Sequence, residues 1–118
     1  MVKLVSRDEL MKMLSAEQKF KLVDVLSSEH YQDEHIKGAV SLPLDQIDKK
    51  AEKVFKKDDL IVVYCASFQC QASTMAAEKL AFLGYKNVLD YKGGIKDYKE
   101  AGLPLEGRIH GTKSKSTR

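Results

Sequence analysis

The sequence predicts an α/β fold of three layers, in which a mainly parallel central sheet is flanked by helices on both faces. Short apolar runs of strand type alternate with amphipathic helical segments along the chain. The connections between them are short, which favours right-handed crossovers between parallel strands. Residues 60–64 are apolar throughout and rich in β-branched side chains, as in a strand buried on both faces. A ligand site in such a sheet lies outside the carboxyl ends of the strands.

The first predicted elements are a helix and a buried strand. Ser6 and Glu9 form a capping-box pattern that begins the helix, and apolar residues follow at helical spacing from Leu10. Residues 20–26 form a short apolar run that contains Val23, which has the length and composition of a buried strand.

The next segment predicts a helical turn over 30–35, a break at Gly38 and a short strand over 39–42. Pro43 then opens a second helix. Its apolar positions follow the spacing of one buried stripe, namely Leu44, Ile47, Ala51, Val54 and Phe55.

The second half of the chain repeats this alternation. After the strand over 60–64 and a polar loop, a helix begins near Gln71 and ends at Gly84, which is expected to be a left-handed C-cap. Residues 87–89 form a short strand. A Gly93-Gly94 turn then leads into a last helix that ends near Gly102.

Length and composition predict one domain over residues 1–105, because 118 residues with 43% apolar content build a single core. Residues 106–118 are basic and poor in apolar side chains, and are expected to form a disordered tail rather than a nucleic-acid-binding arm. The chain shows neither a signal peptide nor a membrane-spanning run, so a soluble cytoplasmic protein is expected, without nucleic-acid or membrane partners.

Both cysteines lie in one loop, which directs attention to their reactivity rather than to a disulfide framework. Cys65 ends the strand over 60–64, and the loop leads to the N-terminus of a helix. The unpaired NH groups and partial positive charge at a helix N-terminus favour an anion. We therefore expect a lowered pKa for the Cys65 thiol and a nucleophilic thiolate. The alternative is that Cys65 is a small buried hydrophobe.

Three segments resemble the rhodanese family of sulfurtransferase domains. They are Leu22-Val23-Asp24-Val25 with Glu34-His35-Ile36-Lys37-Gly38-Ala39-Val40; Val62-Val63-Tyr64-Cys65-Ala66-Ser67; and Tyr91-x-Gly93-Gly94-Ile95-x-x-Tyr98-x-x-x-Gly102-Leu103-Pro104. The resemblance implies a rhodanese-like fold in a single domain. It also implies that Cys65 is the catalytic residue, which takes up sulfane sulfur as a persulfide without metal or organic cofactor and passes it to a nucleophilic acceptor. The active-site loop is Ala66, Ser67, Phe68, Gln69, Cys70 and Gln71.

The loop departs from many rhodanese loops, because it carries no charged residue and no glycine. An uncharged loop favours a polysulfide, a low-molecular-weight persulfide or a donor protein over thiosulfate as the sulfur donor. The expected acceptors are a thiol, cyanide or a partner protein, and the protein is expected to act as a monomer or weak homodimer.

Cys70 has two interpretations. Its thiolate could attack a Cys65 persulfide, releasing hydrogen sulfide and leaving a disulfide, or it could face the core without a role. Phe68 either lines the pocket or packs inward. Asp24 and His35 are expected to hydrogen-bond within the scaffold.

The sequence also bears on two other functions. The scaffold also resembles dual-specificity phosphatases and arsenate reductases, which need arginine six positions after the cysteine; here that position is Gln71, so no guanidinium would clamp a phosphoryl group. The stronger alternative is a non-catalytic redox-sensing or protein-interaction module that uses Cys65 and Cys70.

Overall fold

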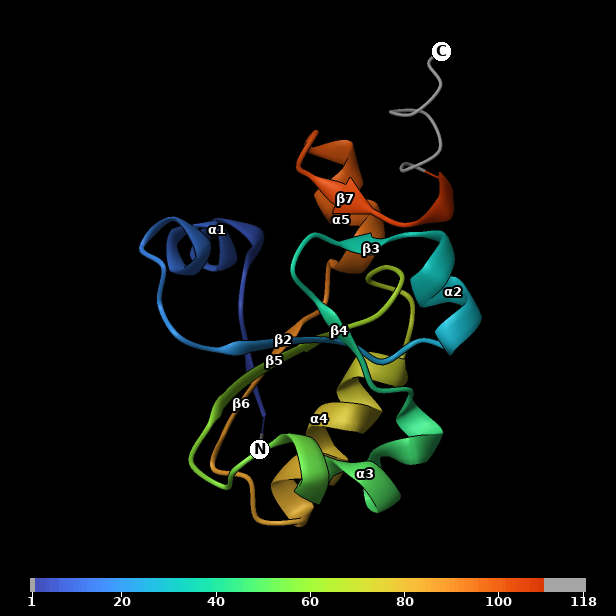
Figure 1. Ribbon diagram of the computed structural model, residues 1–118. Coiled ribbons are helices and arrows are strands. Elements are labelled where there is room, and N and C mark those ends of the chain that lie inside the picture. The colour runs from blue at the N-terminus through green and yellow to red at the C-terminus, as the bar shows by residue number, and fades with distance from the viewer. Residues whose placement is uncertain (1, 110–118) are drawn as a thin grey trace.

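A five-stranded parallel sheet forms the centre of the fold, in the computed structural model of the chain, which describes residues 2–109 (Figure 1). Every pairing in this sheet is parallel. The strand order is β1 (Lys3–Leu4), β6 (Asn87–Tyr91), β5 (Leu60–Tyr64), β2 (Lys21–Asp24) and β4 (Val40–Ser41). A separate antiparallel pair joins β3 (His35–Ile36) to β7 (Leu105–Glu106).

The helices cover both faces of this sheet, which confirms the predicted three-layer α/β fold. Figure 1 shows α1 on one side of the strands and the pair α3 and α4 on the other. The helices are α1 (Arg7–Ser15), α2 (Ser28–Asp33), α3 (Ile47–Val54), α4 (Ala72–Phe82) and α5 (Gly94–Glu100), with a 3-10 turn at Leu44–Gln46 before α3.

The alternating side chains of β5 build two cores. Ile61 and Val63 face the α3 and α4 side, where they pack with Leu80. Val62 and Tyr64 face the other side and pack with residues of α1, α5 and β3, namely Leu10, Tyr98 and Ile36. These four side chains are fully buried, so β5 lies at the centre of the core.

Most predicted boundaries agree with the structure to within a few residues. The Ser6 and Glu9 capping box is present, and Gly84, which follows the C-cap Leu83 of α4, has a φ of +102°. The strand predicted over 87–89 extends to Tyr91.

Three short strands were missed. Lys3 and Leu4 in β1 are both exposed, so they lack the apolar pattern on which a strand prediction depends. The pair β3 and β7 has two residues in each strand. β7 crosses the expected boundary at residue 105. Residues 110–118, most of the expected tail, lie outside the described residues.

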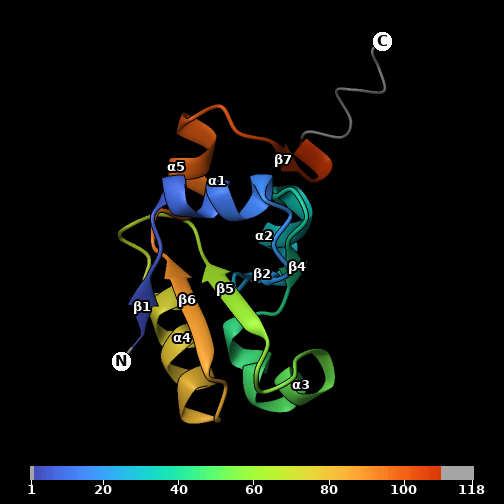
Figure 2. The ribbon, with the colours of Figure 1, turned by 90° about the vertical axis from the view of Figure 1, so that its left-hand side faces the viewer.

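The carboxyl ends of β5 and β6 point toward the end of the molecule where α5 lies (Figure 2). Cys65 follows β5 directly, and the Gly93-Gly94 turn follows β6. Because these two strands are neighbours, the loop after β5 and the turn after β6 meet at this edge. Between residues 2 and 109, no helix has the length and apolar character to cross a membrane.

Candidate active site

The start of the loop after β5 is tied to the N-terminus of α5. The backbone oxygens of Cys65 and Ala66 accept hydrogen bonds from the amides of Ile95 and Lys96, at 3.0 and 2.9 Å. Gly94 makes this approach possible, because its φ is +64° and a Cβ there would lie 2.4 Å from the Cys65 oxygen. The turn predicted at Gly93-Gly94 is therefore present, and a side chain at residue 94 would obstruct it.

The Cys65 side chain is fully buried, with 0% of its surface exposed. Its Sγ accepts a hydrogen bond from the Ser73 amide at 3.3 Å and donates one to the Cys70 carbonyl oxygen at 3.5 Å. The Ser73 amide belongs to the first turn of α4, so the expected contact between this thiol and a helix N-terminus is present.

The expected lowering of the Cys65 pKa is wrong. Burial raises the pKa of this thiol, and its hydrogen bond with Cys70 raises it further; the bonds with Ser73 lower it only in part. The helix N-terminus contributes as predicted, but the loss of solvation around a buried sulfur is the larger effect.

The pKa of the Cys70 thiol is shifted in the opposite direction. Its side chain is half-buried, and its amide closes a turn onto the Ser67 oxygen at 3.0 Å. Burial alone would raise the pKa of this thiol. The Cys65 thiol, the backbone amides of Ala66 and Ala72 and the charge of Lys92 together lower the pKa below its ordinary value. Of the two thiols, Cys70 therefore ionises first.

Lys92 supplies a positive charge that the loop itself lacks. Its Nζ donates a hydrogen bond to the Cys70 carbonyl oxygen at 2.9 Å. Sequence analysis missed this residue, although the strand pairing could have indicated it. Tyr64 lies opposite Tyr91, so the residues that follow them, Cys65 and Lys92, leave neighbouring strands at one level.

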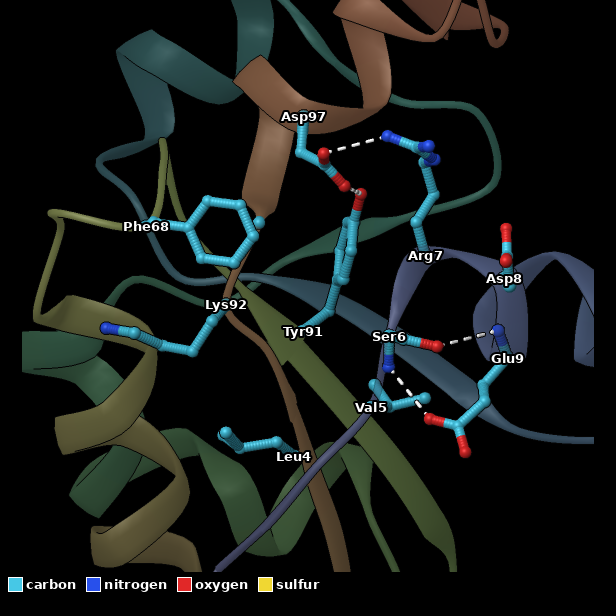
Figure 3. Close-up of a pocket in the computed structure, with 11 residues that line it drawn as sticks. Leu4, Val5, Ser6, Arg7, Asp8, Glu9, Phe68, Tyr91, Lys92 and Asp97 are labelled. Atoms are coloured by element: carbon cyan, nitrogen blue, oxygen red, sulfur yellow. Dashed lines mark hydrogen bonds and ion pairs between the residues drawn. The ribbon is translucent and has the colours of Figure 1, made fainter.

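A cavity of about 520 Å³ opens beside this loop (Figure 3). Phe68 lies at its margin and is 61% exposed, so its side chain lines the pocket and does not pack inward. Asp97 also lines this cavity, and it accepts hydrogen bonds from Arg7 at 2.8 Å and from the Tyr91 hydroxyl at 2.7 Å. Arg7 is thus paired with a carboxylate.

The other predicted loop residues lie near the protein surface. Ala66, Gln69 and Gln71 are exposed. The Ser67 hydroxyl donates to the Gln69 side-chain oxygen at 3.2 Å. A second cavity, of about 400 Å³, reaches the start of the loop at Ala66 and is lined there by Leu26 and Ile95. The loop therefore borders both cavities.

Asp24 and His35 belong to the scaffold, as expected. Asp24 Oδ1 accepts the Leu26 amide at 2.9 Å, and burial raises the pKa of this carboxyl. The His35 ring stacks on Tyr31 with 3.8 Å between ring centroids, and its Nδ1 lies 2.6 Å from the Tyr31 carbonyl oxygen. Within residues 2–109, no three His, Cys, Asp or Glu side chains gather as they would around a metal ion.

Comparison with known proteins identifies similar chains. The family model of the rhodanese-like domain matches residues 6–101. The thiosulfate sulfurtransferase PspE of Escherichia coli is 38% identical over 76 residues, covering 64% of this chain and 70% of PspE. The putative sulfur carrier protein YrkF of Bacillus subtilis is 27% identical over 94 residues, covering 80% of this chain but 49% of YrkF.

A solved structure has the same fold. The solution structure of the rhodanese-like domain of the Alr3790 protein from Anabaena sp. matches with a TM-score of 0.84 and 28% identity. The match covers 100% of this chain and 86% of that domain. The overall arrangement of sheet, helices and loop is therefore shared with this domain.

Proposed function

The chain belongs to the family of rhodanese-like domains, and on this basis we propose that it is a sulfurtransferase that carries sulfane sulfur as a persulfide on Cys65. Relatives with the same domain are named as a thiosulfate sulfurtransferase and a putative sulfur carrier. The observation that carries the proposal is the position of Cys65, at the end of the central strand with its Sγ against the first turn of α4.

The reaction has two halves. In the first, a sulfur atom moves from the donor to Cys65, and the donor leaves as a thiolate or other sulfur anion. In the second, an acceptor nucleophile attacks the outer sulfur, and the Cys65 thiolate leaves. The α4 N-terminus and the Ser73 amide favour negative charge at this position in both halves. The loop holds sulfur with its own side chains and amides, without a cofactor.

The charged side chains around the loop do not favour thiosulfate, a compact anion with two charges. Lys92 is engaged with the Cys70 carbonyl oxygen and Arg7 with Asp97, so neither forms a free pair of donors for a doubly charged anion. A polysulfide, a low-molecular-weight persulfide or a donor protein fits better than thiosulfate. Thiols, cyanide and a partner protein are the proposed acceptors. Since two reduced cysteines must persist, we place the activity in the cytoplasm.

The test measures sulfur transfer by the full-length protein. Reduced wild type, Cys65→Ser and Ser15→Ala are given polysulfide or thiosulfate. Sulfur transfer to cyanide and the intact mass of each protein are then measured. Cys65→Ser is expected to lose turnover by about 100-fold or more, because the carrier thiol is gone. Ser15→Ala, a change at an exposed residue at the end of α1, is expected to turn over normally.

Three results would count against the proposal. Unchanged turnover in Cys65→Ser would show that another thiol carries the sulfur. No turnover in wild type with either donor would remove the transferase function. An immediate loss of two hydrogens, without added sulfur, would assign the Cys65 and Cys70 pair to a redox-sensing module.

A further inference from the structure

The two thiols of the loop differ in their access to solvent. Cys65 has no exposed surface, whereas Cys70, five residues later, is half-buried. A persulfide or polysulfide donor is much larger than one sulfur atom, and the donor must bring its sulfane sulfur into line with the attacking thiol. In the structure, Cys70 is the thiol that solvent can reach.

Cys70 is also held against both Lys92 and Cys65. Its carbonyl oxygen accepts the Lys92 Nζ at 2.9 Å and the Cys65 Sγ at 3.5 Å. The turn from its amide to the Ser67 oxygen fixes its backbone from the other side. The half-buried Cys70 and the buried Cys65 are thus neighbours within one loop.

The charge distribution agrees with this difference in access. The pKa of Cys70 is lowered by Cys65, by the amides of Ala66 and Ala72 and by Lys92, whereas burial raises the pKa of Cys65. At a given pH the larger fraction of reactive thiolate is therefore on Cys70.

We propose that Cys70 takes the sulfane sulfur from the donor and passes it inward to Cys65. The inference rests on the proposed function, in which Cys65 carries the sulfur to the acceptor. In this order Cys70 acts in the first half of the reaction, the uptake of sulfur. The donor that fits Cys70 is a persulfide or polysulfide that ends in an accessible sulfane sulfur.

Both steps balance as exchange reactions. The Cys70 thiolate attacks the outer sulfur of a donor R–S–SH; a new sulfur–sulfur bond forms on Cys70, the donor bond breaks, and R–S⁻ leaves with the electron pair. The Cys65 sulfur then attacks that outer sulfur, and the bond to Cys70 breaks. Cys70 keeps the electron pair and receives the proton that Cys65 gives up. No oxidant or reductant is consumed.

A single-turnover experiment on the full chain tests this order. Reduced protein is mixed with glutathione persulfide and quenched at increasing times with iodoacetamide, and fragment masses assign the added sulfur to Cys65 or Cys70. In wild type the sulfur is expected on Cys70 first and on Cys65 later. In Cys70→Ser, loading of Cys65 is expected to slow by about ten-fold or more, because the accessible thiolate is missing.

Cys65→Ser separates this inference from the proposed function. The variant is expected to load Cys70 at the wild-type rate and to stop there, without turnover to the acceptor. Ser15→Ala, at an exposed residue of α1, is the control and is expected to load both thiols as wild type does. Loading of Cys65 at the wild-type rate in Cys70→Ser would overturn the relay and leave the proposed function intact; turnover in Cys65→Ser would overturn the proposed function.

A measurement on the wild-type protein tests the relay independently of any folding defect in Cys70→Ser. Reduced wild type is treated with a small amount of iodoacetamide, without sulfur donor, and the labelled cysteine is identified. Label on Cys70 before Cys65 supports the relay, and label on Cys65 first contradicts it.

Discussion

The backbone oxygen of Cys65 lies 3.0 Å from the amide nitrogen of Ile95. This approach requires glycine at position 94, because a Cβ there would collide with the Cys65 oxygen. This contact joins the carboxyl end of the central strand to the first turn of α5. It fixes where the active-site loop begins. The geometry of the thiol pair therefore depends on a residue in a different part of the chain.

Gly94→Ala is expected to lower the free energy of unfolding by about 2 kcal/mol or more, because the new Cβ meets the Cys65 oxygen at 2.4 Å in a backbone with φ +64°. Gly38→Ala is the control. Its φ of +88° carries similar strain, but nothing lies within 4 Å of the new Cβ. Urea unfolding measures both variants. An equal loss of unfolding free energy in both variants would mean that the loop after β5 moves to make room for the alanine side chain at position 94.

Tyr64→Phe is expected to destabilise the protein by about 1–3 kcal/mol, because the Tyr64 hydroxyl accepts the buried Ile36 amide at 2.9 Å and that amide would lose its partner. Tyr85→Phe provides the comparison, since the buried Tyr85 hydroxyl has no hydrogen-bond partner among the described residues. Its removal is expected to be neutral or slightly stabilising. Thermal and urea unfolding compare the pair, and an equal cost for both would contradict the role of the Tyr64 bond.

Lys92→Gln is expected to raise the pKa of Cys70, because the ammonium favours the thiolate and the amide does not. The pH at which iodoacetamide labels Cys70 at half its maximal rate should then move upward, and labelling at neutral pH should slow by a few-fold. The other groups that act on this thiol, Cys65 and the backbone amides, are retained. Lys96→Gln, a change at an exposed residue of α5, is the control.

An unchanged pH profile in Lys92→Gln would show that Cys65 and the backbone amides set the Cys70 pKa without Lys92. The same shift in Lys96→Gln would point to the net charge of the surface instead. Only a shift specific to Lys92 fits the contact at 2.9 Å.

The elements that local sequence determines were predictable. Ser6 and Glu9 carry their own cap, and the apolar run at 60–64 can hardly be other than a buried strand. The loop, the family and the place of Cys65 also followed from the sequence. The two-residue strands did not, because β1, β3 and β7 form through pairing with distant segments and lack a period of their own.

The burial and pKa of the two thiols could not be predicted from the sequence, because they also depend on contacts with distant segments. Cys65 is buried in a core cluster that includes Ala76 of α4 and Val25, the residue after β2. Lys92 reaches the loop from the next strand of the sheet. A helix N-terminus can be predicted locally, but desolvation is a property of the assembled core, and here it reverses the expected direction of the pKa.

The strand order also sets an order of assembly. β1 is the first strand of the chain, yet Lys3 lies opposite Leu89 in β6. During synthesis β1 therefore waits without a partner until β6 has left the ribosome, and such distant pairings slow folding. Until β1 pairs, the edge of β6 is open to pairing with another chain. The two residues of β1 therefore cover a strand edge at which aggregation could begin.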